Sequence, residues 1–250
     1  MSGHSKWSQI KRQKGVADVK RGLLFTKLAR EIVMSAKQGG GDPAGNARLR
    51  LAIQRARDGN MPVENIERAI KRGSGEGAGA VDMVEIVYEG YSPGGAAVYV
   101  QVMTDNRNRS VSDVRRVFTR NGGSLGESGS VAWLFESRGV LNAEAGEADE
   151  DSLAMAAIDA EAEDVKTYGE GLEVYASAER LEAVRAALEE HGATIATAEI
   201  QMVPTTLVPL NTSSARQTLR LLDLMEELED VQKVYTNADF PNEVLAEVAS

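Results

Sequence analysis

The first third of the chain places its apolar residues with the 3.6-residue period of an α-helix. Over residues 16–38 they fall on one arc at about 100° per residue, and three glycines end the segment. A second helix is predicted over 46–59, because Asn46 is a favoured N-cap residue. A third is predicted over 62–73, because proline is favoured in a first helical turn. Three short amphipathic helices can bury their apolar stripes only against one another, so residues 1–80 are predicted to form a small helical domain.

Each predicted helix has its own expected buried stripe. The positions expected to face inward are Leu24, Phe25, Leu28, Ala29, Ile32 and Ala36 in the first helix, Leu49, Ala52, Ile53 and Ala56 in the second, and Val63, Ile66 and Ile70 in the third.

Beyond residues 73–80, a glycine-rich stretch expected to be a linker, the period of the pattern falls to two. This alternation, rich in valine and tyrosine, is typical of strands, and Ser92 to Gly95 supply a turn between the first two. The predicted elements are strands 83–88 and 96–103, a helix that opens at Ser110 or Ser112 and runs through Phe118, and a strand 131–135.

From residue 137 the chain repeats an order of strand, helix, strand, strand, helix, strand, which is that of a ferredoxin-like domain. The expected strands are 138–142, 164–168, 171–176 and 194–203, and the expected helices are 150–161 and 179–190. A helix 214–228 and a strand 231–235 then remain without a sheet of their own.

The strands before residue 137 and the strand near the C-terminus both lack partners, so we expect them to share one sheet. The predicted domains are a basic helical domain with arm and linker, 1–80, a discontinuous α/β domain, 81–136 plus 205–250, and an acidic ferredoxin-like insert, 137–204. The predicted fold class is α+β, with an N-terminal helical domain and two α/β domains, the last of them inserted and ferredoxin-like (βαββαβ).

Composition removes several kinds of protein from consideration. The chain has no cysteine, which excludes disulfides, zinc fingers, iron–sulfur clusters and thiol catalysis and fits a reducing compartment. The sequence shows no apolar run long enough to cross a bilayer and no apolar stretch of a secretory signal near its start. We therefore expect a cytoplasmic protein that does not bind membranes.

The charge is distributed unevenly, and this changes the meaning of the overall −10. Residues 1–80 hold sixteen Lys or Arg and seven Asp or Glu, a net charge of +9, so the remainder carries −19. Such asymmetry is typical of a polyanion-binding module attached to an acidic body. Lysine and arginine bind nucleic acid chiefly by displacing counterions from phosphates.

Two groups of residues are predicted to bind nucleic acid. The first is the N-terminal arm with one face of the first helix, and the second lies where the second strand meets the following helix, where backbone donors favour phosphate. The predicted residues are Lys6, Trp7, Lys11, Arg12 and Lys14 in the arm, Lys20, Arg21, Lys27, Arg30 and Lys37 in the first helix, and Arg107, Arg109, Arg115 and Arg116 in the second group.

Each group has a purely structural alternative. The helix charges can simply solvate a helix face, although four cations on one arc argue against that. The Trp7 ring can pack against the helical domain as readily as it can stack on a base. In the second group, the side chains of Asp105 and Asn106 can serve only to form a turn.

Catalysis is not expected. The two histidines, His4 and His191, lie in the arm and at a helix end, where His191 suits the helix dipole better than it suits general-base work. There is no P-loop signature, and the glycine-rich stretch follows a helix instead of a strand. The acids Glu147 to Asp151 lack the spacing of a calcium loop. We expect no enzymatic activity, no metal and no cofactor.

Longer motifs run along the whole chain, among them GHSKW, GDPAGNARLRLAI, NMPVENIERAIKRG, YEGYSPGGAAVYV, TDNRNRSVSDVRRVF, GGSLGESGSVAW and DVQKVYTNADF. In these motifs the sequence resembles the YebC/PmpR family, which includes the mitochondrial translational activators of cytochrome oxidase. The resemblance implies a three-domain protein without known catalytic activity. Members are described as DNA-binding transcriptional regulators, and others as translation factors that act at the ribosome.

Three functional hypotheses follow. The first is a DNA-binding transcriptional regulator, although no helix-turn-helix signature is evident. The second is a translation factor that binds ribosomal RNA or the ribosome. The third is a protein–protein adaptor that works through the acidic insert. The expected partner is nucleic acid, DNA or ribosomal RNA, and the oligomeric state is left open.

Overall fold

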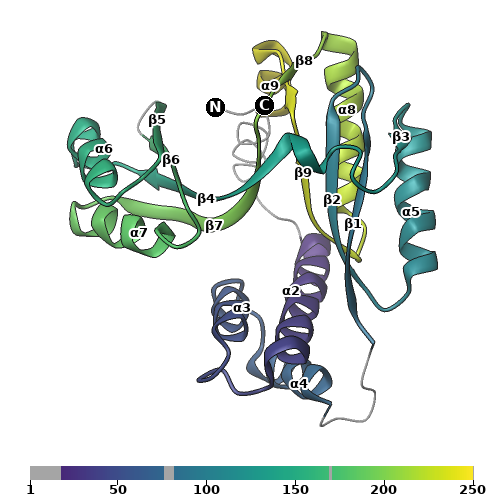
Figure 1. Ribbon diagram of the computed structural model, residues 1–250, viewed down its shortest axis with the longest axis horizontal. Helices are drawn as coiled ribbons and strands as arrows, with labels where there is room; N and C mark the ends of the chain where they lie inside the picture. Colours follow the sequence, from purple (N-terminus) through teal and green to yellow (C-terminus); the bar gives the residue numbers. More distant parts are fainter. Residues whose placement is uncertain (1–17, 76–81, 169–170, 250) are drawn as a thin grey trace. The chain divides into compact units, whose positions relative to one another are not determined.

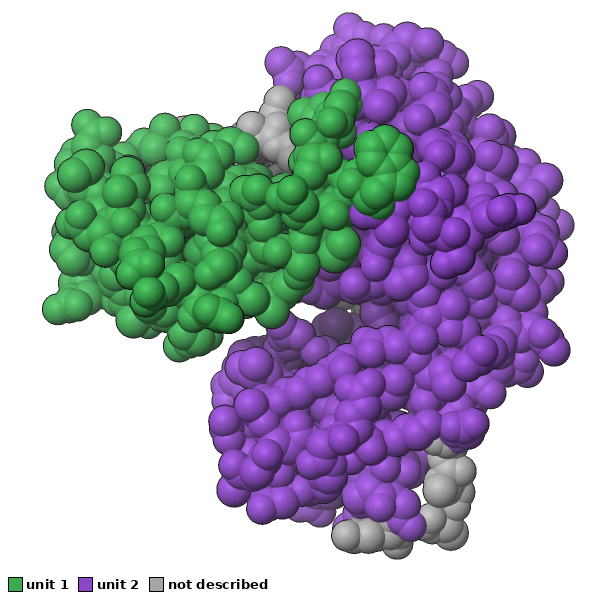
Figure 2. All heavy atoms as spheres, viewed as in Figure 1, with its two compact units in different colours: residues 1–6, 133–207 green, residues 7–132, 208–250 purple. Residues whose placement is uncertain are grey.

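The computed structural model describes residues 18–75, 82–168 and 171–249. The described chain forms two compact units, which we call the insert unit, residues 133–207, and the main unit, residues 18–132 and 208–249 (Figures 1 and 2). None of the helices in the described ranges combines the length and the apolar character that a bilayer crossing requires.

The main unit begins with three helices, α2 (Asp18–Gly39), α3 (Ala47–Asp58) and α4 (Val63–Ser74). Asn46 connects the first two, because its side-chain oxygen caps α3 at the amide of Leu49 (3.0 Å). The Asn46 amide group in turn donates to the carbonyls of Ser35 (2.8 Å) and Gly40 (2.9 Å) at the end of α2. One side chain thus satisfies backbone groups at two helix ends.

The three helices bury one shared core against each other, as their apolar period predicts. Its members include Leu28, Ile32, Val33, Leu49, Ala52, Ile53, Ala56, Ile66 and Ala69, together with Met83 and Met103 from the neighbouring strands. Two expected inward positions were wrong: the side chains of Leu24 and Val63 are 41% and 62% exposed. Both lie in the first two turns of their helices.

The main sheet has the strand order β3-β1-β2-β9, and every neighbouring pair is antiparallel. Its strands are β1 (Val84–Tyr91), β2 (Ala97–Thr104), β3 (Ser124–Leu125) and β9 (Val231–Thr236). The helices packed on it are α5 (Arg107–Arg120) and α8 (Thr212–Glu226). Strand β9, from the end of the chain, pairs with β2, and α5 and α8 bury their apolar faces against the same core. A parallel pair, β8 (Val208–Pro209) with β10 (Ala238–Asp239), and helix α9 (Asn242–Ala249) complete the unit.

One predicted helix start and one predicted strand were wrong because of polar side chains. Helix α5 begins at Arg107, before the predicted Ser110 or Ser112, because the Asn106 side chain caps it at the amide of Arg109 (3.0 Å). The predicted strand 131–135 is instead a 3₁₀ turn over Ala132–Leu134. The pattern also missed β3, β8, β10 and α9, which are short.

The buried carboxylate of Glu89 explains why the segment before the insert is not a strand. It accepts hydrogen bonds from the backbone amides of Gly129 (2.6 Å), Val131 (2.7 Å) and Ala132 (2.7 Å). A strand neighbour would need the same amides. The sequence alone does not reveal that Glu89 takes them.

The insert unit contains β4 (Phe135–Glu144), α6 (Glu150–Asp159), β5 (Asp164–Tyr168), β6 (Gly171–Ala176), α7 (Leu181–Glu190) and β7 (Thr194–Pro204). Its sheet has the order β5-β6-β4-β7 with antiparallel neighbours, which is the ferredoxin-like arrangement. The predicted α+β class, with helical, α/β and ferredoxin-like parts, is confirmed.

The two ends of the insert lie next to each other. Phe135 pairs with Pro204 across the β4–β7 ladder, and the amide of Thr205 donates to the carbonyl of Leu134 (2.9 Å). The chain therefore leaves the main unit and returns to it through neighbouring residues. We propose that residues 81–136 with 205–250 and residues 137–204 fold as separate domains, beside the helical domain 1–80.

Replacing residues 135–204 by two glycines should leave the main unit folded, because Leu134 and Thr205 are already in contact. Ending the chain at residue 204 should instead unfold the main sheet, since that removes β9 and the buried residues of α8. Circular dichroism melts and amide hydrogen exchange of both variants test this. Loss of cooperative unfolding in the first variant would show that the proposed domains are not independent.

Candidate nucleic-acid interface

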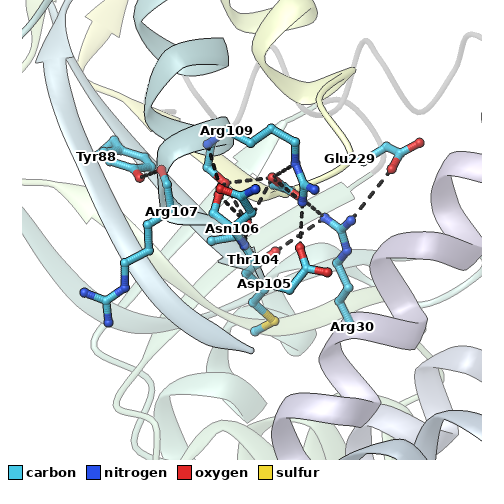
Figure 3. A network of polar contacts seen from close by, with 11 residues as sticks. Arg30, Tyr88, Thr104, Asp105, Asn106, Arg107, Arg109 and Glu229 are labelled. Atoms are coloured by element: carbon cyan, nitrogen blue, oxygen red, sulfur yellow. Dashed lines mark hydrogen bonds and ion pairs between the residues drawn. The ribbon is translucent and has the colours of Figure 1, made fainter. Parts of the chain in front are cut away.

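A carboxylate in the turn between α8 and β9 joins four segments of the main unit (Figure 3). The Asp230 side chain, only 9% exposed, forms an ion pair with Arg30 of α2. It also accepts hydrogen bonds from Arg109 (2.9 Å from Nη2 to Oδ1) and, at 2.7 Å, from the hydroxyl of Ser110 at the start of α5. Thr104, at the end of β2, donates from 3.1 Å. We call these five residues the Asp230 network.

The hydrogen bonds and charges of the network favour the ionised form of Asp230. Burial alone would raise the pKa of Asp230, but hydrogen bonds from Arg109 and Ser110 and the charges of Arg30 and Arg109 outweigh it and lower that pKa below its ordinary value. Hydrogen bonds from Arg109 to Asp230 and Asp105 raise the pKa of its guanidinium. The aspartate is therefore ionised at neutral pH, and both arginines are held in place.

The basic face of α2 is directed at the rest of the main unit. The ammonium of Lys27 donates to the carbonyl of Glu226 at the end of α8 (2.6 Å). That of Lys37 binds Asp82 (2.6 Å) and the carbonyl of Met83 (2.9 Å), just before β1. With Arg30 in the Asp230 network, three predicted binding residues thus attach α2 to other segments of the main unit. That they also contact nucleic acid stays a prediction.

The other predicted binding residues are placed differently. Lys6, Trp7, Lys11, Arg12 and Lys14 lie outside the described residues, as does the side chain of Lys20, and Arg21, Arg107 and Arg115 are exposed. Arg116 forms an ion pair with Asp113 (2.8 Å), and Arg109 belongs to the Asp230 network. Within the described chain, the structure brings Arg30 and Arg109 together but does not join either to Arg107 or Arg115.

A pocket of about 350 Å³ lies between α2, α4 and the strand ends. Its apolar wall includes Phe25, Val33 and Met83, and Arg68 and Arg72 of α4 lie at its edge. Both arginines are exposed and four residues apart, so they stand one above the other on α4. Neither forms an ion pair with any described residue. We call this the α2–α4 pocket.

Arg68 and Arg72 were not among the predicted binding residues. Their spacing on α4 is visible in the sequence, and it placed them on the outward face. What the sequence does not show is that the side chains of α2 opposite them leave a hollow.

Two family models match this chain. One, described as the TACO1/YebC protein N-terminal domain, matches residues 5–76. The other, described as the TACO1/YebC second and third domain, matches residues 83–238. The chain belongs to the TACO1/YebC family. The resemblance inferred from the motifs is thereby confirmed.

Relatives within the TACO1/YebC family are similar over their whole length. A probable transcriptional regulatory protein of Dehalococcoides mccartyi is 57% identical over 98% of this chain and 97% of its own. One of the same name from Rubrobacter xylanophilus is 54% identical over the full length of both chains. The crystal structure of a conserved hypothetical protein from Aquifex aeolicus has a TM-score of 0.80 and 45% identity, and the match covers 90% of this chain and 92% of that one.

Replacing Asp230 by asparagine should lower the free energy of unfolding at neutral pH by about 3 kcal/mol, because two guanidinium groups lose their carboxylate. This difference from the wild type should shrink in acid. The pKa of Asp230 is lower in the folded state, so its stabilising contribution is full above the ordinary value of 3.8 and disappears as the pH falls through the folded-state value. Urea denaturation at several pH values measures both effects.

Glu229→Gln is the matched control, since Glu229 also faces Arg30, at 3.7 Å, but its side chain is 71% exposed. Its effect should stay below about 0.5 kcal/mol. A D230N protein as stable as the wild type at pH 7 would show that the network does not hold the helices on the sheet.

Proposed function

We propose that this TACO1/YebC protein is a non-enzymatic, nucleic-acid-binding regulator of gene expression in the cytoplasm, and more closely a DNA-binding transcriptional regulator. The observation that carries the proposal is the pair Arg68 and Arg72 at the edge of the α2–α4 pocket, in the part of the chain with a net charge of +9. The relatives named probable transcriptional regulatory proteins support the same role.

The chemistry of the pocket suits a nucleic acid. A guanidinium group presents paired donors that match two oxygens of a phosphate, and Arg68 and Arg72 present two such groups on successive turns of α4. The wall behind them, with Phe25 and Met83, is apolar and can accept a sugar or the face of a base. The insert unit, residues 133–207 with a net charge of −13, repels phosphate, so binding is directed away from that unit.

The contacts of α2 determine which variants can test this proposal. Reversing the charge of Lys27, Arg30 and Lys37 would remove contacts that attach α2 to other segments of the main unit. A loss of binding in such a variant would then have two explanations. Arg68 and Arg72 avoid this difficulty, because they make no ion pair within the described chain.

The double variant R68A/R72A should bind a mixed-sequence oligonucleotide about tenfold more weakly, because two charge-assisted contacts are lost. The slope of log K against log salt should become less negative by about 1.5, as expected for two lost phosphate contacts. Fluorescence anisotropy over a series of salt concentrations measures both quantities, on DNA and on RNA of the same sequence.

The double variant R180A/R185A is the control. It removes the same charge from the insert unit, where both arginines are paired with glutamates, and it should bind like the wild type. Equal affinity and slope for R68A/R72A and the wild type would refute the pocket as the binding site. A wild-type protein that binds neither polymer even at low salt would refute the function and favour the adaptor hypothesis.

A ribosomal-RNA-binding translation factor is the second candidate. The observation that favours it is that Arg68 and Arg72 border a pocket, whereas a recognition helix in a DNA major groove presents an exposed side-chain face. A pocket with cations at its edge suits an unstacked base of folded RNA. The acidic insert unit would then keep that part of the protein from binding RNA.

Ultraviolet crosslinking in growing cells, followed by sequencing of the bound nucleic acid, distinguishes the two candidates. For the transcriptional regulator we expect reads at discrete promoter sites that disappear in R68A/R72A. Reads concentrated on ribosomal RNA, lost in the same variant, would instead establish the translation factor. R180A/R185A again serves as the control and should keep the wild-type pattern.

A further inference from the structure

A second hollow lined by arginines lies between helices α5 and α8 of the main unit. These helices contact each other and cover the same face of the main sheet (Figure 1). The hollow has a volume of about 700 Å³. It is lined by Arg116, Val117, Arg120 and Asn121 of the α5 segment and by Arg220, Leu224, Glu227 and Leu228 of the α8 segment. We call it the α5–α8 groove.

Two of its arginines lack the partners that neighbouring arginines have. Arg116 is paired with Asp113 (2.8 Å), and Arg216, one turn before Arg220 on α8, is paired with Glu247. Arg120 and Arg220 are exposed, and neither forms an ion pair with a residue in the described ranges. Two helices that are about a hundred residues apart in the chain thus each contribute an arginine without an ion pair to the lining of one groove, beside the carboxylate of Glu227.

Like charges that share a groove repel each other, and an anion between them removes that repulsion. Phosphate is one of the anions that guanidinium groups bind through two parallel hydrogen bonds. Leu224 and Leu228, both partly buried, add apolar side chains to the lining of the groove. Cations beside an apolar floor are the combination that binds a backbone together with its sugars or bases.

We propose that the α5–α8 groove binds the phosphate backbone of a nucleic acid through Arg120 and Arg220. It would be a second contact surface, in addition to the α2–α4 pocket. This inference rests on the proposed function and deepens it. Both arginines are exposed at the edge of the groove, which suits a polymer that passes over it better than a small enclosed ligand. Arg115, also exposed on α5, extends the positive surface.

A protein partner is the competing occupant. Residues 133–207 carry a net charge of −13, so the insert unit of a second copy would also be complementary to the groove. Charge alone does not separate the two. Because the proposed function already brings a nucleic acid to the main unit, the groove would meet that polymer at high effective concentration, which favours the nucleic acid over a second copy.

The test is the double variant R120A/R220A in the full-length protein, titrated with a mixed-sequence oligonucleotide of about 30 residues, as RNA and as DNA. We expect a loss of affinity of about tenfold and a salt slope less negative by about 1.5. R180A/R185A, which removes the same charge from the insert unit, should match the wild type. Thermal melts establish that both variants are folded.

Every outcome bears on the inference. If R68A/R72A weakens binding and R120A/R220A does not, the groove is not a contact surface while the proposed function stands. If the wild type binds neither polymer, both fail together. If R120A/R220A leaves binding unchanged but abolishes self-association in sedimentation at low salt, the occupant is the acidic insert of another copy, and the proposal is overturned.

Discussion

The ion pairs of Asp230 are the interaction on which the rest of the main unit depends. Its carboxylate follows α8, yet it holds Arg30 of α2 and Arg109 of α5. Helices α2, α3 and α4 have an apolar core of their own. Among its described residues, only Met83, just before β1, and Met103, in β2, come from beyond α4. An ionised, buried carboxylate between two guanidinium groups fixes their direction as well as their distance. The arrangement of the α2–α4 pocket beside β1 and β2 therefore depends on a residue 200 positions further along the chain.

The cations of the basic N-terminal part have two different tasks. Lys27, Arg30 and Lys37 attach α2 to the end of α8, to the turn after it and to the residue Asp82 before β1. Arg68 and Arg72, on α4, face the solvent at the edge of a pocket. A net charge of +9 does not distinguish between these tasks, because charge counts cations without their partners. Cations without carboxylates are the ones available for phosphate, and this criterion leads to Arg120 and Arg220 as well, far from the basic segment.

The TACO1/YebC architecture was largely predictable, and the exceptions have specific causes. The order of elements in residues 137–204 predicted the ferredoxin-like insert, because each strand and helix carries its own period. The 3₁₀ turn at Ala132–Leu134 was not predictable. Glu89, which follows the predicted strand 83–88, accepts hydrogen bonds from the amides of Val131 and Ala132 at the start of this turn. Helix α5 begins earlier than predicted for a similar reason, because the polar side chain of Asn106 caps it.

The sequence by itself determined the α+β class, the family, the helical and strand segments and the concentration of positive charge before residue 80. These properties depend on local periodicity, composition and motif, so they can be predicted without knowing which residues are in contact in the folded protein. Only the tertiary structure decided which arginines are neutralised. That depends on how distant segments pack, which pairs Arg30 with Asp230 and places Arg120 and Arg220 in the lining of one groove. The sequence gives the charge of each side chain, whereas the packing of the fold determines which ion-pair partner that side chain has.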